Sequence, residues 1–285
     1  YWTPNSNNLI AYRIEPSKIS EVHLLESSPK GGGKAKLYTR RYPLPGDKFT
    51  SHELNWFDIE KKLHVKPDVG VIDFHWPNMR WSLDGRTFTY RKVDRGHQRF
   101  RIIEVDTFTG KARNIIDEVS KTFIWTNHAK DYGVSQVTWL KKTKEIIYIS
   151  EQDGWRHLYL VDVATGKKKQ ITKGEYVLRY VDKIDEEKRQ IWFRASGRNP
   201  KQDPYLIHYY RINFDGGGLT ALTEGDGTHE VRYSPDRKYL IDTYSRIDMA
   251  PVNELRRVSD GGLVCKLEES DISQLEASGW EAPEV

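Results

Sequence analysis

The sequence has little sulfur chemistry and little charge bias. Its only cysteine, Cys265, cannot form a disulfide within the chain or supply the several thiolates of a zinc site. Lys and Arg number 45 against 41 Asp and Glu, so the charge balance gives no indication of nucleic-acid binding. No apolar run approaches the roughly 18 residues that a membrane-spanning helix needs.

Other properties place the chain among folded proteins. Hydrophobic residues make up 37% and aromatic residues 12% of the sequence, which is too apolar and too aromatic for a disordered chain. The first residue is Tyr1 rather than Met. We therefore expect the chain to be a segment cut from a longer protein.

Helical periodicity is scarce, whereas short β-rich runs alternate with turn residues. Residues 145–150 and 157–162 are two such runs. Between them stands Asp153-Gly154, a hairpin signal because glycine accepts a positive φ. Together with their flanking runs, residues 137–172 predict four short strands in a meander.

The same turn-then-strand pattern recurs along the chain. Its anchor residues are Trp2, Trp81, Trp139, Ile184 and Tyr233. After a longer first interval they recur about every 50 residues, which is typical of a four-stranded propeller blade that buries its faces against its neighbours. The sequence thus predicts an all-β fold, a partial β-propeller of about five four-stranded blades, with each anchor at an equivalent point of its blade.

Two segments fall outside the repeat. Residues 30–48 contain three consecutive glycines and two prolines, and they predict a loop or an extra hairpin that projects from the first blade. After Cys265 the strand pattern fades, and one or two helical turns are expected with Ser270 or Asp271 as the N-cap. We expect the blades to occupy residues 1–268 and an exit segment to occupy residues 269–285.

Common catalytic and ligand-binding motifs fail in this sequence. No serine lies in the Gly-x-Ser-x-Gly elbow of a hydrolase. The triglycine before Lys34 lacks the other residues of a phosphate loop, and no two histidines stand three to five residues apart. Arg86 replaces the glycine that an Asp-box requires, and Asp226 lacks the alternating carboxylates of a calcium loop. We therefore predict no catalytic residue, no metal and no cofactor in this chain.

Several segments, in order, resemble the propeller of the dipeptidyl peptidase IV family. The resemblance covers essentially the whole chain. The segments are WTPNS at 2–6, AYR at 11–13, EQDGWRHLYL at 151–160, QITKG at 170–174, GDGTH at 225–229, YSPD at 233–236 and DTYS at 242–245.

The resemblance implies a parent enzyme of the prolyl oligopeptidase type. In that family an eight-bladed propeller joins an α/β-hydrolase domain, whose Ser–Asp–His triad removes N-terminal dipeptides, usually after proline. The propeller restricts entry and anchors the free amine of the peptide. We expect this chain to be the non-catalytic gating part, because neither the triad nor the paired glutamates that hold the amine match any of its residues. The parent would be periplasmic or secreted, with a peptide substrate bound jointly with the hydrolase domain.

Three residues are candidates for contact with the peptide. Lys130 and Tyr132 lie in a loop that, by resemblance, corresponds to the aromatic–arginine pair lining the second subsite. Arg156 lies in a dense polar and aromatic cluster, where it could bind peptide carbonyl or carboxylate groups. A structural interpretation stays open beside this one: Trp155 would be wedged between blades, and Arg156 or His157 would bond turn carbonyls.

Two other functions remain open at this point. One is a stand-alone propeller that binds peptides or proteins, and a weaker one is a glycan-binding propeller. The coding sequence that follows residue 285 would distinguish them, since a hydrolase elbow favours the peptidase. Because blades cut from a larger propeller expose faces that are normally covered, self-association is expected near residues 9–13 and 264–267.

Overall fold

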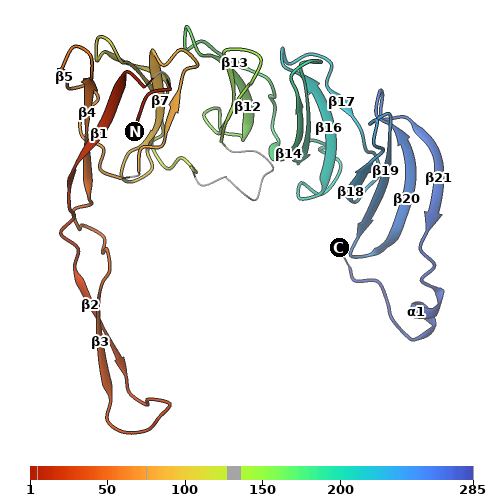
Figure 1. Cartoon of the computed structure of the whole chain (residues 1–285). Coiled ribbons are helices and arrows are strands. Elements are labelled where there is room, and N and C mark those ends of the chain that lie inside the picture. Colours follow the sequence, from red (N-terminus) through yellow and green to blue (C-terminus); the bar gives the residue numbers. More distant parts are fainter. Residues whose placement is uncertain (5, 75, 127–135, 285) are drawn as a thin grey trace. The chain divides into compact units, whose positions relative to one another are not determined.

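The computed structural model describes residues 1–4, 6–74, 76–126 and 136–284 (Figure 1). Within these ranges the fold is all-β, with strands β1–β21 and one short helix, α1. The chain divides into two compact units, Tyr1–Ile124 and Trp125–Val285. The all-β prediction is therefore confirmed, and the sheets below are propeller blades.

The first unit holds two blades. Strands β1 (Asn8–Glu15), β4 (Ser51–Asp58) and β5 (Leu63–Val65) form an antiparallel sheet, which an isolated bridge from Trp2 to Leu9 extends. The second sheet is a four-stranded meander of β6 (Met79–Trp81), β7 (Thr87–Val93), β8 (Arg99–Asp106) and β9 (Ala112–Val119). Ile10, Leu54 and Trp56 from the first sheet pack with Phe88 and Tyr90 from the second in one buried core.

The second unit holds three four-stranded meanders. Their strands are β10 (Val137–Trp139), β11 (Glu145–Ser150), β12 (His157–Asp162) and β13 (Lys168–Gln170); β14 (Val177–Asp185), β15 (Gln190–Ser196), β16 (Ile207–Asn213) and β17 (Thr220–Ala221); and β18 (Thr228–Tyr233), β19 (Tyr239–Arg246), β20 (Met249–Arg257) and β21 (Leu263–Glu269). The meander expected over residues 137–172 is confirmed.

Apolar residues between neighbouring blades hold this unit together. Ile149 and Leu158 of the β10–β13 blade share a buried cluster with Leu178 and Phe193 of the β14–β17 blade. On the next interface Trp192 and Tyr209 belong to a cluster that includes Leu240. Each blade thus covers the faces of its neighbours, as the repeat length predicts.

The anchor residues occupy equivalent positions. Four of the five are at or near the end of the first strand of their sheet, and all five pair with a residue seven positions further along the chain. The pairs are 81 with 88, 139 with 146, 184 with 191 and 233 with 240, and the isolated bridge joins 2 with 9. The sequence repeat therefore coincides with a repeat of backbone register.

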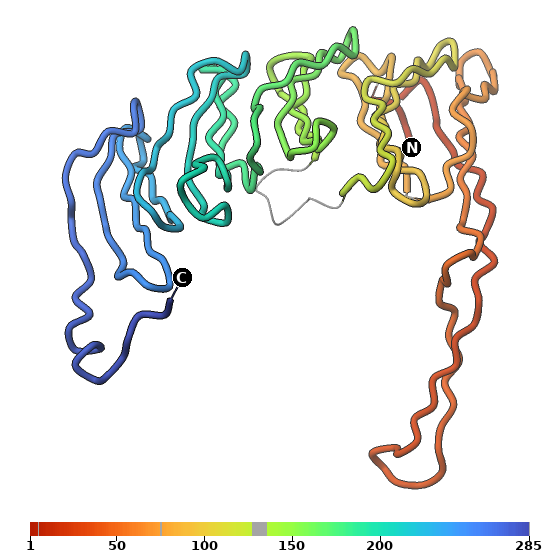
Figure 2. Tube along the Cα trace, turned by 180° about the vertical axis from the view of Figure 1, so that it is seen from behind, coloured from red at the N-terminus to blue at the C-terminus, as the bar shows by residue number. Residues whose placement is uncertain are grey.

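The insertion in the first blade is a hairpin, but it begins earlier than the sequence suggests. Strands β2 (Glu21–Glu26) and β3 (Lys36–Arg41) pair as a two-stranded ribbon that Figure 2 shows leading away from β1 and β4. The expected start at residue 30 is wrong, because residues 21–26 also belong to the ribbon. Glycine and proline mark only its tip and its return, so composition does not reveal the first strand.

The end of the chain also differs in detail from expectation. Strand β21 continues through Cys265 to Glu269, where the sequence pattern had faded. Helix α1 spans Ser273–Ala277 with Ile272 as its N-cap, so the predicted cap at Ser270 or Asp271 is wrong. The Asp271 carboxylate nevertheless accepts a hydrogen bond from the Ser273 amide at 2.9 Å. The division at residue 268 stays a prediction.

The two segments expected at exposed edges behave differently. Ile10 in β1 is buried in the core of the first unit, and self-association near residues 9–13 stays a prediction. In β21 the side chains of Leu263, Val264 and Leu267 are exposed. Of the helices in the described part of the chain, none is long and apolar enough to cross a membrane.

Candidate functional site: a buried histidine, carboxylate and arginine network

Of the residues predicted to contact a peptide, the structure describes Arg156 alone. Its side chain is 4% exposed, and its guanidinium lies 5.7 Å from the centroid of the Trp125 ring. Lys130 and Tyr132, together with His128 and Asp131, lie outside the described residues. A role of the three candidates in peptide binding stays a prediction.

The residues next to Arg156 test the structural interpretation. His157 is fully buried, and its Nε2 lies 2.9 Å from the carbonyl oxygen of Gly174, so the predicted bond to a turn carbonyl is confirmed. The Nδ1 of the same ring lies 3.0 Å from the Thr172 hydroxyl. Trp155 is 39% exposed, which is less than half of its surface, and its predicted position between blades stays a prediction. The turn presents this indole partly to solvent and buries the next two side chains instead.

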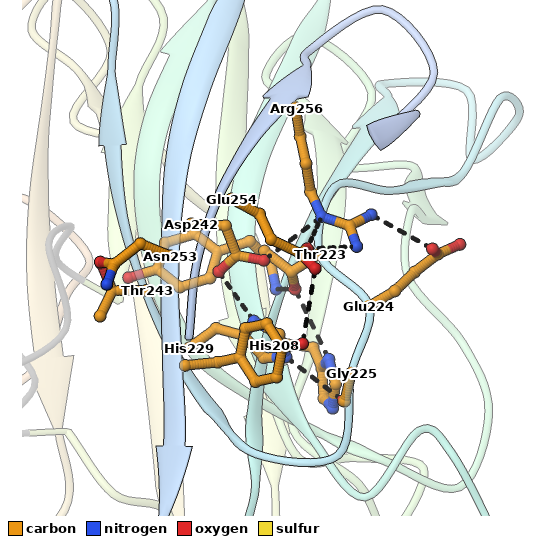
Figure 3. A network of polar contacts seen from close by, with 12 residues as sticks. His208, Thr223, Glu224, Gly225, His229, Asp242, Thr243, Asn253, Glu254 and Arg256 are labelled. Carbon is orange, nitrogen blue, oxygen red and sulfur yellow. Dashed lines mark hydrogen bonds and ion pairs between the residues drawn. The ribbon is translucent and has the colours of Figure 1, made fainter. Parts of the chain in front are cut away.

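A second polar cluster, which we call the His–Asp network, lies in the last blade and in the strands facing it (Figure 3). At its centre the Nδ1 of His229 is 2.8 Å from Oδ1 of Asp242, and both side chains are 0% exposed. The Nε2 of His229 is 3.4 Å from the Gly225 carbonyl oxygen. The two residues are diagonal neighbours across β18 and β19, where Val231 pairs with Asp242.

Arg256 gathers the carboxylates of this network. Its Nη2 donates a hydrogen bond of 2.7 Å to Glu254, and its Nε lies 3.5 Å from Asp242. Its Nη1 donates to the Gly261 carbonyl oxygen at 3.0 Å and to Glu224 at 3.2 Å. Because Asp242 and Glu254 are directly opposite in the sheet, their like charges would repel without this guanidinium.

Burial also changes the proton affinity of the network. Desolvation raises the pKa of Asp242, although the hydrogen bond from His229 and the charge of Arg256 oppose that change. His208, whose ring centroid lies 4.5 Å from that of His229, comes from the neighbouring blade. Desolvation and the nearby His229 lower the pKa of His208 to about 4, so this ring is neutral at pH 7.

A histidine bonded to a buried carboxylate can serve as a general base, but only beside a nucleophile that a substrate can reach. None of the ten residues labelled in Figure 3 is a serine or a cysteine. Glu224 is the member whose side chain is mostly exposed. The arrangement binds neighbouring strands together.

Sequence reasoning noticed the segments that carry this network without assembling it. His229 and Asp242 stand in the GDGTH and DTYS segments, and the period-two alternation of β20 places Glu254 and Arg256 on one face. The signal for this network in the sequence was the pair Glu254 and Arg256, two opposite charges at alternate positions of one predicted strand. In the described ranges no group of three or more His, Cys, Asp or Glu side chains could hold a metal ion.

These blades and their buried ties define a propeller-domain protein. Residues 1–251 match the family model described as dipeptidyl peptidase IV (DPP IV) N-terminal region. The chain belongs to this family, as its sequence motifs indicated.

Individual proteins that are similar to this chain are named as dipeptidyl peptidases, in agreement with the family model. The chain is 25% identical over 183 residues to dipeptidyl peptidase 4 of Trichophyton equinum and 26% identical over 183 residues to that of Trichophyton rubrum. Each alignment covers 63% of this chain and 23% of the relative. The crystal structure of Porphyromonas gingivalis dipeptidyl peptidase 4 has a similar fold, with a TM-score of 0.61 and 18% identity, covering 97% of this chain and 37% of that chain.

Proposed function

We propose that this chain is the substrate-gating and substrate-binding propeller of a dipeptidyl peptidase IV-like serine exopeptidase. The observation that carries the proposal is the family match over residues 1–251. The four-stranded blades and the peptidase names of the relatives support it. The parent would cleave N-terminal dipeptides with a preference for proline at the second position.

The division of labour follows from the chemistry that acyl transfer requires. Hydrolysis needs an activated nucleophile, a base within hydrogen-bond reach and donors for the oxyanion. The sequence has no nucleophile elbow, and the buried His229–Asp242 pair has no serine or cysteine among the labelled residues of its network. The propeller would therefore contribute binding and access, and residues 269–285 would lead from the blades of residues 1–268 toward the hydrolase.

Within this proposal Lys130, Tyr132 and Arg156 contact the peptide, and the parent protein works in the periplasm or outside the cell. Of these three candidates, Arg156 is the best one to test by substitution, because it is the one whose contacts the structure describes. Replacing it by lysine keeps the charge but removes the planar fork that binds carbonyl or carboxylate oxygens in pairs. A raised KM with an unchanged kcat would support contact with the peptide, whereas unchanged kinetics would remove Arg156 from the site.

The test of the whole proposal compares two proteins with the same chromogenic X-Pro dipeptide substrate at equal molarity. The full-length parent should release the chromophore, and residues 1–285 alone should not. A serine-reactive inhibitor should abolish the activity of the parent. Turnover by residues 1–285 alone would show that this chain holds a catalytic site of its own. An inert parent would favour the stand-alone peptide- or protein-binding propeller.

A further inference from the structure

A cleft between the β14–β17 and β18–β21 blades has a composition that the peptidase function does not explain. Its volume is about 460 Å³, and the turns after β14, β18 and β20 line it. We call it the basic cleft and define it by six cationic side chains: Lys183, Lys188, Arg211, Arg237, Lys238 and Arg257. The carboxylates of Asp185 and Asp236 are the anionic side chains that line it.

Three residues of this lining carry buried hydrogen-bond donors without a hydrogen-bond partner among the described residues. They are Nε1 of Trp192, Nε of Arg211 and Nη1 of Arg237. Trp192 is 4% exposed. Buried donors nearly always find an acceptor, and leaving one unpaired costs about 1–3 kcal/mol. These three nitrogens are shielded from solvent, so a group bound in the cleft would reach them only after the lining side chains move.

The Arg211 guanidinium is held in a fixed orientation. Its Nη1 donates to the Val258 carbonyl oxygen at 3.0 Å, and its Nη2 donates to the Ser259 carbonyl oxygen at 2.8 Å. Its Nη2 also donates to the Thr220 hydroxyl at 3.3 Å. These acceptors are uncharged, so among the described residues no carboxylate forms a hydrogen bond with this cation. An arginine that is positioned by backbone groups and keeps its charge is well suited to bind an anion.

Arg237 occupies a backbone position where glycine is easier to accommodate. Its φ is 53°, in the left-handed region that disfavours residues with a Cβ. The corresponding residue in the Trp81 turn of the second blade is Gly85, with a φ of 67°. The side chain of Arg237 stacks on Tyr233, with its guanidinium 4.4 Å from the ring centroid. Its turn therefore retains an arginine at a conformational cost.

We propose that the basic cleft binds a ligand carrying a phosphate or sulfate group. A tetrahedral oxyanion presents several acceptor oxygens in different directions, and arginine forks bind such groups with charge-assisted hydrogen bonds. Arg211 and Arg237 both line the cleft, and a bound oxyanion would compete with Asp185 for Lys183 and with Asp236 for Lys238. The cleft would thus give the propeller a site for an anionic group.

Isothermal titration calorimetry of the intact protein with inorganic pyrophosphate tests this proposal, and inorganic sulfate in a second arm separates the two chemistries. The variant Arg237→Gly suits the positive φ, so it should fold, and it should bind pyrophosphate about tenfold more weakly, since one lost arginine–phosphate contact corresponds to that ratio. Lys238→Gln, at an exposed side chain, should weaken binding several-fold without changing the unfolding temperature.

The matched control is Lys34→Gln, which removes the same unit of charge from the exposed tip of the β2–β3 hairpin. It should bind pyrophosphate as the unaltered protein does. Equal weakening by Lys34→Gln and Lys238→Gln would reduce the effect to net charge and overturn the proposal. Absence of binding to both anions, or unchanged affinity in Arg237→Gly and Lys238→Gln, would also overturn it. Tighter binding of sulfate than of pyrophosphate would assign the cleft to sulfate groups.

Discussion

His229 Nδ1 lies 2.8 Å from Asp242 Oδ1, and neither side chain reaches solvent. The pair joins the first two strands of the last blade, and Arg256 extends it to Glu254 and Glu224. A buried carboxylate is tolerated when it is paired and hydrogen-bonded, and both conditions hold here. The contribution of the pair to stability should therefore be visible when one member is removed.

Asp242→Ala should lower the free energy of unfolding by about 3 kcal/mol, because breaking a buried pair leaves its partners uncompensated. His229 would lose the acceptor of its hydrogen bond, and Arg256 would lose an ion-pair partner 3.5 Å away. Denaturant titration followed by circular dichroism measures the change. Asp260→Ala, which removes an exposed ion pair with Arg257, is the control and should cost less than about 1 kcal/mol. Equal effects of the two substitutions would show that burial of the Asp242 pair is immaterial.

The pH dependence of stability should contain a contribution from His208. Its pKa falls from 6.5 to about 4 on folding, so between these values the unfolded chain binds more protons than the folded one. The contribution of His208 to stability is therefore complete above pH 6.5 and is lost as the pH falls toward 4. His208→Gln, which does not titrate, should show a shallower fall of the melting temperature in this window.

His23→Gln is the control for that experiment, because His23 lies exposed on the β2–β3 hairpin. It should leave the slope between pH 6.5 and 4 close to that of the unaltered protein. A slope that His208→Gln leaves unchanged would contradict the lowered pKa of His208.

Tryptophan burial makes a third prediction. Trp56 is buried in the core of the first unit, and Trp56→Ala should cost about 3–5 kcal/mol. Trp155 has 39% of its surface exposed, so Trp155→Ala should lower the free energy of unfolding by less than about 2 kcal/mol. Chemical denaturation measures the free energy of unfolding of both variants, each of which replaces one tryptophan by alanine. A larger loss at Trp155 would support the wedged position expected from the sequence.

The exposed apolar residues of β21 favour self-association. Leu263, Val264 and Leu267 lie on the last strand of its sheet, where unpaired backbone groups can add another strand. We expect light scattering to show a mass that rises with concentration, and Val264→Lys to reduce the rise. Lys36→Gln, on the hairpin, should leave it unchanged. A constant monomer mass at high concentration would exclude association through β21.

Local pattern was sufficient to predict the blades. The anchors Trp81, Trp139, Ile184 and Tyr233 lie beside tight turns, where residue type and backbone conformation are closely linked. The sequence did not predict strand β2, because the boundary of this strand depends on its pairing with β3 rather than on a turn signal. The sequence also did not predict Ile272 as the helix cap. The polar side chain that accepts the hydrogen bond from the Ser273 amide belongs to Asp271, one position before the cap.

The polar network and the basic cleft were beyond sequence reasoning because both depend on which blades are neighbours. His208 and His229 come from different sheets, as do Arg211 and Arg237. In the sequence, lysine and arginine near turns look like ordinary surface residues. Only the structure shows that two of these turns line one cleft. The guanidinium of the buried Arg156 likewise lies near the ring of Trp125, a neighbour that no local pattern identifies.

The hairpin inserted between β1 and β4 has a consequence for the order of folding. The other blades close through short turns, but the first must join Glu15 to Ser51 across residues 16–50. Closing a longer loop costs about 0.6 kcal/mol for each doubling of its length. Pairing of β2 with β3 first would bring Glu21 to Arg41 and shorten the loop that remains. The ribbon would thus act as a folding aid, and lengthening its tip should slow the first blade while leaving the others unaffected.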